Sequence, residues 1–381
     1  MISLLIDRRH VPDVRLALGL VLPSLAGLAV YGWRSLGVGI LVVLGALSSQ
    51  ALMRRFRTGY LTPGRVWIAV HALLLTLFLP ATLFDLDRAA IQTDSRWPGA
   101  LAAGVLLCLI SGFLRRFGIA RFSAVPVTLV LLILVQPSLF DADRVLTPQH
   151  LFRGDLLDER AVVRSSATAE PWIDSHDSGG HVFITEPAAY RIHEYLNGRP
   201  AHGLPSETIT RLLSDEIPPL EDFVIAGRAG RIGNASAIAL LIGGLFLVQR
   251  RFVAFRVIAI MLLACYLTFL LLPVPIVIGN DGAVRVSFAA SDPRVGWATG
   301  ITFVNDLFFT APVLLTAIYL GCQAGVRPSG LGAGVIFAIL FGAAMAAATV
   351  FVSVRNGPIL AVIPLQFLTP TLERLFPQRS V

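Results

Sequence analysis

The chain has no lysine, and charged residues make up only 14% of its 381 positions. Soluble domains carry charge at about a quarter of their positions, so this scarcity excludes an ordinary chain of soluble domains. Hydrophobic residues make up 55% of the sequence. They gather in blocks of about 20 residues, which is the length that a helix needs to cross a bilayer. The composition therefore indicates a polytopic membrane protein.

Cysteine is scarce as well, with only Cys108, Cys265 and Cys322 in the whole sequence. Each lies inside an apolar block, and none has a partner at the spacing of metal ligands. This pattern argues against a disulfide framework and against an iron–sulfur cluster within this chain. We expect all three to be small buried side chains. Three histidines of the long polar segment, His176, His181 and His193, match no compact metal site, so no metal is predicted.

The arginines predict the topology. Ten apolar blocks are candidate spans, at about 16–33, 35–53, 66–84, 98–114, 123–140, 232–249, 257–278, 296–320, 331–353 and 358–372. One alternating set of links holds sixteen arginines, and the opposite short links hold six. The positive-inside rule places both termini in the cytoplasm and the long segment 141–229 on the far side. The net charge of +7 thus reflects topology and lipid contact, and no nucleic-acid partner is expected.

The segment 141–229 differs from the rest of the chain, because it holds 15 of the 24 acidic residues and five of the seven histidines. Loops of this length are usually functional. Five spans precede it and five follow, which predicts an all-α polytopic membrane protein of about ten helices. The helices form two inverted five-helix repeats, 1–140 and 230–381, on either side of this extracytoplasmic segment. Pro80 and Pro312 interrupt apolar runs at corresponding places, and sites in such folds lie at the repeat interface.

Two groups of polar residues stand out near the membrane. Asp306, beside Asn305, is an acid within a span, where an unpaired charge is costly and often functional. We consider both an ion path and an acid that binds backbone amides near a helix break. The second group is the glycine-rich turn before the sixth span, with Arg228, Gly230, Arg231, Gly233 and Ser236. Free amides at a helix start bind phosphate well, so this turn is a candidate cofactor site.

The run from Gly230 to Phe246 resembles the Gly-Ser-Ile-Gly-Glu-Thr-Ser-Ala helix start of a known family. That family contains the RnfD protein of the Rnf electron-transport complex and the NqrB protein of the sodium-translocating NADH:quinone reductase. Phe308-Phe309-Thr310-Ala311-Pro312-Val313 is similar to the family's Phe-Phe-x-Thr-Asp-Pro-Val, and Asn356-Gly357-Pro358 precedes the last span. The similarity spans most of the chain and implies a multi-pass protein of the bacterial inner membrane with a periplasmic loop.

The resemblance also implies a cofactor. In this family a flavin transferase links FMN by a phosphoester to the threonine of a Ser-x-Ala-Thr motif, and Ser165, Ser166, Ala167 and Thr168 match it. It implies partner subunits, including a flavoprotein, and leaves a second flavin (riboflavin) and Na⁺ or H⁺ translocation open. The chain is then a redox relay that is not catalytic alone.

Several residues depart from the family pattern. The Asp of Thr-Asp-Pro is Ala311, the Glu-Thr of the helix start is Asn234-Ala235, and Val162 replaces an Asp before the flavin motif. These losses put ion translocation in question. They leave two other functions open: a flavin-free permease or channel on the same scaffold, and an enzyme acting on a lipid-linked substrate, for which no nucleophile constellation is visible.

Overall fold

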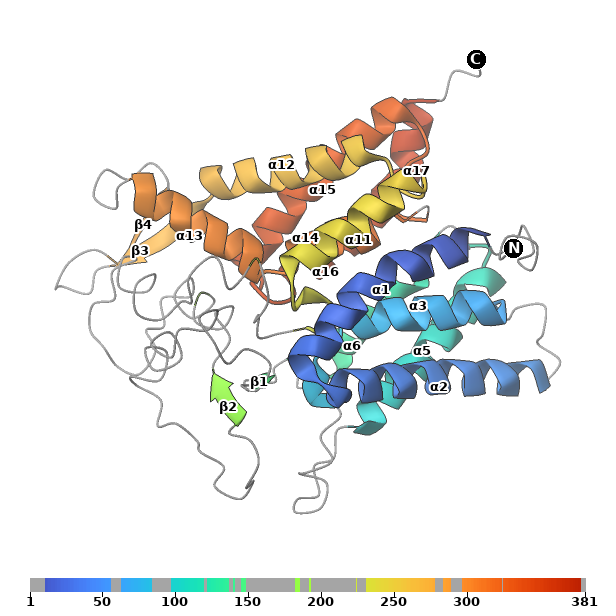
Figure 1. Ribbon diagram of the computed structural model, residues 1–381. Helices are drawn as coiled ribbons and strands as arrows, with labels where there is room; N and C mark the ends of the chain where they lie inside the picture. Colours follow the sequence, from blue (N-terminus) through green and yellow to red (C-terminus); the bar gives the residue numbers. More distant parts are fainter. Residues whose placement is uncertain are drawn as a thin grey trace.

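The computed structural model describes residues 11–55, 63–83, 97–119, 122–136, 140, 145–148, 182–185, 192, 224, 231–277, 284–288, 297–323 and 325–377. Its helices form two groups that lie side by side (Figure 1). The first group contains α1 (Val11–Tyr31), α2 (Trp33–Arg55), α3 (Arg65–Leu77), the short η4 (Ala81–Leu83), α5 (Trp97–Arg116) and α6 (Ala124–Val135). The second contains η9 (Ile232–Asn234), α11 (Ala237–Gln249), α12 (Phe255–Leu271), α13 (Trp297–Thr310), α14 (Val313–Leu315), the π-helical η10 (Thr316–Gly321), α15 (Leu331–Phe351), α16 (Gly357–Leu360) and α17 (Val362–Leu375).

The helices have the length and composition of a multi-pass membrane protein. In the part of the chain that the structure describes, four helices are long and apolar enough to cross a bilayer, namely α1, α2, α5 and α15. A fifth candidate is the bent pair of α13 with α14 and η10, and four shorter apolar helices accompany them (α3, α6, α11 and α12). Leucines such as Leu44, Leu134 and Leu245 are exposed on the helix surfaces. Lipid offers no hydrogen-bond partner to the backbone, so helices are the form in which such apolar segments cross it.

The helix ends differ from the predicted spans where proline interrupts the ladder. Each predicted block overlaps a helix, but the block 66–84 is helical only to Leu77 before Pro80. The block 296–320 is bent by 52° between Thr310 and Val313. Pro312 has no N–H and its ring clashes with the carbonyl one turn before it, which accounts for the break.

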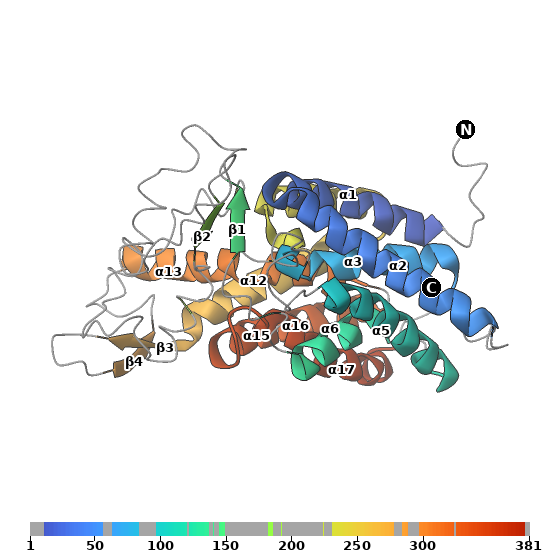
Figure 2. The ribbon, with the colours of Figure 1, turned by 90° about the horizontal axis from the view of Figure 1, so that it is seen from below.

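The all-α prediction missed two short antiparallel hairpins, β1 (Val145–Pro148) with β2 (Val182–Thr185) and β3 (Pro273–Val277) with β4 (Val284–Phe288). In the second hairpin Pro273 pairs with Phe288 and Val277 with Val284. The strands are rich in valine, which favours extended backbone, and Asn280-Asp281-Gly282 between them are residue types typical of tight turns. The strands lie at one end of the helical bundle, and the start of α1 and the end of α17 lie at the other (Figures 1 and 2).

Glycines let two pairs of helices pack closely in the same way. A Cβ added at Gly104 of α5 would lie 2.0 Å from the carbonyl oxygen of Val42 in α2. A Cβ at Gly342 of α15 would lie 2.3 Å from the carbonyl oxygen of Met261 in α12. Small residues at helix interfaces allow this backbone approach within membranes. The same contact therefore joins α2 to α5 in the first group and α12 to α15 in the second.

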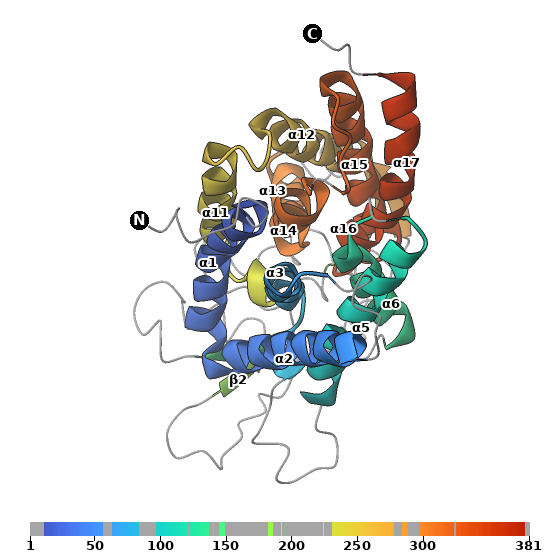
Figure 3. The same ribbon diagram turned by 90° about the vertical axis from the view of Figure 1, so that its right-hand side faces the viewer.

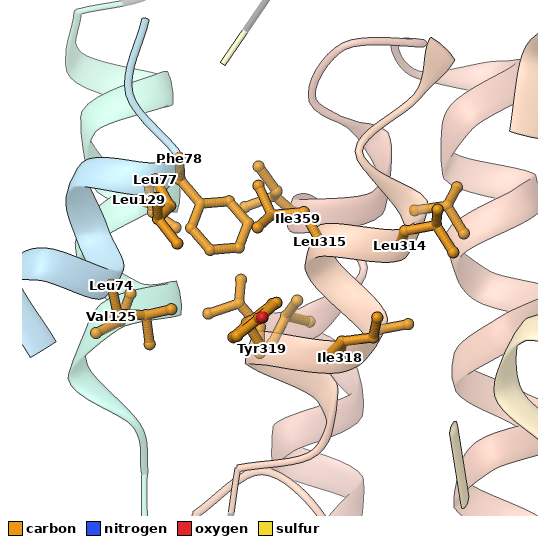
Figure 4. Packing of buried hydrophobic residues seen from close by; sticks show 14 of the residues in the cluster. Leu74, Leu77, Phe78, Val125, Leu129, Leu314, Leu315, Ile318, Tyr319 and Ile359 are labelled. Carbon is orange, nitrogen blue, oxygen red and sulfur yellow. The ribbon is translucent and has the colours of Figure 1, made fainter. Parts of the chain in front are cut away.

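The core lies between the two groups. Seen along the bundle, α3 and α14 occupy the centre and the other helices surround them (Figure 3). Buried side chains of α3 and of the residue after it, of α6, of α14 with η10, and of α16 point toward one another there (Figure 4). Phe78, Leu315 and Ile359 are fully buried in this cluster. The two groups are thus joined by an apolar core in which both interrupted helices end.

Candidate functional site

The segment 231–234, which leads into α11, lies where the two interrupted helices end. The amide of Ile232 donates to the carbonyl oxygen of Leu79 over 3.0 Å, just beyond the end of α3. Pro80 and Arg231 form an isolated antiparallel bridge. On the other side, Asn234 Nδ2 donates to the carbonyl oxygen of Thr310, the last residue of α13, over 3.4 Å. One short segment therefore contacts the carboxyl ends of α3 and α13.

Arg231 is the most highly connected polar side chain of this site. Its Nη1 donates to the carbonyl oxygen of Phe78 over 2.7 Å, and its Nη2 donates to the carbonyl oxygen of Arg355 over 3.1 Å. Nη2 also donates to Oδ1 of Asn356. The guanidinium carbon lies 5.1 Å from the centre of the Phe140 ring, an arrangement that attracts a cation to the ring face.

Burial shapes the electrostatics of Arg231. Only 7% of its surface is exposed. A guanidinium stays charged at neutral pH, and the charge of Arg355 lies near enough to act on it. Phe78 is the C-cap of α3, and the carboxyl end of a helix carries about half a negative charge. The guanidinium therefore lies where the backbone itself supplies negative potential.

Gly233 and Ser236 have local roles in the same turn. A Cβ at Gly233 would lie 2.7 Å from Cβ of Leu77 and 2.9 Å from its carbonyl oxygen, so a larger residue would push α3 away. Ser236 is the N-cap of α11, and its hydroxyl accepts from the amide of Ala239 over 3.3 Å. Such a bond satisfies one of the free amides of a first helical turn.

These contacts bear on the predicted cofactor residues only in part. Arg231, Gly233 and Ser236 lie in one turn, and the hydrogen bonds described for Arg231 and Ser236 are made with other residues of the chain. Arg228, Gly230 and the run from Ser165 through Ser166 and Ala167 to Thr168 lie outside the described residues. Cofactor binding by these residues stays a prediction.

Asp306 and Asn305 lie on α13, one turn before its broken end. Asn305 Oδ1 accepts from Tyr266 Oη of α12 over 2.9 Å. Asp306 is buried, with 3% of its surface exposed. Thr310 lies one turn further along, so the two side chains share a face of α13. Their place beside the helix break suits an ion path, which stays a prediction.

Sequence reasoning missed Phe78, Phe140, Arg355 and Asn356 as partners of Arg231. They come from three places far apart in the chain, and their contacts to Arg231 are made by backbone oxygens, an amide and a ring. The only sequence signals near them are the break at Pro80 and the similarity of residues 356–358 to a family motif.

Residues 172–381, more than half of the chain, match the sequence profile of the NQR2, RnfD, RnfE family. The chain belongs to this family. Family membership confirms the resemblance and, with the apolar helices, makes the chain a multi-pass membrane component of an Rnf- or Nqr-type electron-transport complex. A comparison with curated proteins finds no match. The family match begins at Trp172, so it includes the segment 231–234 and Asp306 but not Thr168.

Proposed function

We propose that this family member is a flavoprotein that relays electrons within its complex through FMN bound covalently to Thr168. The observation that carries the proposal is the motif from Ser165 to Thr168 in a member of the NQR2, RnfD, RnfE family. The motif lies in the long polar segment between α6 and α11 in the sequence. The cofactor performs the redox chemistry, and the protein positions it and sets its electrostatics.

Attachment requires a flavin transferase and a flavin donor with an activated phosphate. The Thr168 hydroxyl attacks the flavin phosphate of a dinucleotide anhydride. A phosphoester forms, the anhydride bond breaks, and a nucleoside monophosphate and the hydroxyl proton leave. No electrons are exchanged in this step. Arg228 is near the end of the same polar segment and Gly230 directly follows it in the sequence, and we include both as residues that approach the phosphate.

The two helix groups are inverted repeats of five spans each in this proposal. Two observations support it. The second and fourth helices of each group make the same close glycine contact, at Gly104 and at Gly342. The third helix of each group is interrupted, after Leu77 and at Pro312. An odd number of spans per repeat inverts the second repeat and places 141–229 on the side opposite both termini.

The arginines support the sidedness. Arg54, Arg55, Arg115 and Arg116 end α2 and α5. Arg15 of α1 binds the carbonyl oxygen of Arg250 over 3.0 Å, which places the start of α1 beside the end of α11. By the positive-inside rule this end faces the cytoplasm. The hairpins and the flavin segment then face the periplasm of a bacterial inner membrane. There a partner flavoprotein of the complex provides electrons to the flavin. A membrane acceptor takes the electrons, and riboflavin is a candidate second flavin on this route.

The test is in-gel ultraviolet fluorescence of the denatured protein after co-expression with a flavin transferase. We expect a fluorescent band that disappears in Thr168→Ala and remains in Thr147→Ala, a matched change in the same segment. A peptide mass increase equal to one esterified FMN at Thr168 identifies the linkage. An unlabelled wild-type protein under these conditions refutes the proposal.

A flavin-free permease is the second candidate function. It is favoured by the two helices that end inside the protein, since discontinuous helices of this kind form substrate sites in transporters. The same gel separates the two functions, because a permease gives no fluorescent band with or without Thr168.

A further inference from the structure

We propose that Arg231 fills a monovalent cation site formed by the carboxyl end of α3 and the turn before α16, and that this tethered charge excludes mobile cations from the site. The proposal goes beyond electron relay and does not depend on the flavin. On this proposal, the presence of Arg231 determines whether the site can bind a mobile cation.

The oxygens around Arg231 are those of a cation site. The carbonyl oxygens of Phe78 and Arg355 and the amide oxygen of Asn356 accept its hydrogen bonds. Neutral oxygens of this kind replace the hydration shell of monovalent cations in channels. In transporters, unwound carbonyls and the carboxyl ends of half-helices coordinate such cations. A guanidinium here takes the place of a free ion.

The helix ends add negative potential to these oxygens. Phe78 caps the carboxyl end of α3, and Asn234, three residues after Arg231, holds the carboxyl end of α13 through Thr310. The carboxyl end of α3, with about half a negative charge, thus lies against the guanidinium, and the positive charge of Arg355 acts against this potential. The Phe140 ring face lies on the guanidinium as well.

The burial of Arg231 explains why a cation is expected to enter the site when this side chain is truncated. A buried charge is costly unless polar groups compensate for it, and here those groups are two backbone carbonyls and the side-chain amide of Asn356. With the side chain truncated, the same oxygens lose the donors that Arg231 supplies. A small cation can then take the place of the guanidinium.

The functional consequence is a closed site. A guanidinium on a side chain cannot move through the protein, so a mobile cation cannot occupy the oxygens at the end of α3. Any ion translocation by the complex takes a route outside this site.

The experiment is chemical rescue of Arg231→Ala in detergent, using protein made without flavin transferase so that the result is independent of Thr168. Thermal unfolding is followed with a thiol-reactive dye, because the three cysteines are buried and free. Millimolar guanidinium chloride is compared with urea, its neutral analogue, and NaCl with choline chloride. We expect guanidinium and Na⁺ to raise the melting temperature of Arg231→Ala by roughly 2–5 °C and to leave the wild type unchanged.

Two further variants sharpen the result. Arg231→Lys keeps a tethered cation and should respond to neither ion. Arg250→Ala removes an exposed arginine at the end of α11 and should also be unresponsive. If Arg231→Ala is recovered only when purified with guanidinium, the proposal stands. A folded Arg231→Ala with equal melting temperatures in all four solutes, or one that no cation recovers, overturns it.

Discussion

Gly342→Ala tests the close packing of α12 against α15. The added Cβ would lie 2.3 Å from the carbonyl oxygen of Met261 and 2.8 Å from the amide nitrogen of Cys265. A comfortable carbon–oxygen contact is about 3.3 Å, so the helices must separate by about 1 Å. A gap of that size forfeits up to about half of each van der Waals contact along the interface. Overpacking costs about 1–3 kcal/mol. The obstructing atoms belong to the backbone and cannot rotate away. We therefore expect Gly342→Ala to lower the free energy of unfolding by about 3 kcal/mol.

Gly334→Ala is the matched control on the same helix. Its Cβ would lie 3.8 Å from Cγ2 of Val257 in α12, an ordinary contact. Alanine favours the helix over glycine by up to about 1 kcal/mol. The stability of Gly334→Ala should therefore be unchanged or slightly higher, although both glycines lie on α15 near α12.

The assay uses the buried cysteines as reporters. Cys265 lies beside Gly342, and Cys108 belongs to the other helix group. We expect Gly342→Ala to lower the melting temperature by roughly 5–10 °C. In Gly342→Ala variants that keep only one cysteine, the dye should react with Cys265 at a lower temperature than with Cys108. Equal melting temperatures for Gly342→Ala and Gly334→Ala would refute the contact between α12 and α15.

Two further changes address the site. Ser236→Ala removes the cap from the Ala239 amide and should cost about 1 kcal/mol, whereas Thr302→Ala, which removes an exposed hydroxyl, should be nearly neutral in the same melting assay. Asp306→Asn keeps the shape of the side chain and removes its charge. If Arg231 closes the site, Na⁺ and H⁺ uptake by vesicles containing the complex will be unchanged in Asp306→Asn, and a loss of uptake would instead place Asp306 in an ion path.

The helices were largely predictable because their apolar runs are long, and the breaks were located by Pro80 and Pro312. The hairpin of β3 and β4 was not, because Pro273 to Val277 is as apolar as the helix before it. The predicted span 257–278 therefore continued through the strand. A short apolar run does not by itself distinguish helix from strand.

The position of the site in the sequence was predictable, but the residues that contact Arg231 were not. The glycines around Arg231 marked the turn into α11, and a phosphate was the natural partner for an arginine at a helix start. Phe78 and Asn356, which the structure brings to this arginine, lie 153 and 125 residues away. No local pattern links a carbonyl at the end of one helix to a side chain at the start of another.

A tethered cation and a mobile one have opposite consequences for energy coupling. Moving one charge across the membrane potential is worth about 2.3 kcal/mol per 100 mV, and a cation that enters and leaves the helix ends can transfer that energy to an electron carrier nearby. Arg231 offers the helix ends the same positive charge but cannot leave them. The oxygens of Phe78, Arg355 and Asn356 accept its hydrogen bonds, so they do not need a mobile ion. If Thr168 carries the proposed flavin, its electron relay thus operates without coupling to an ion at the Arg231 site.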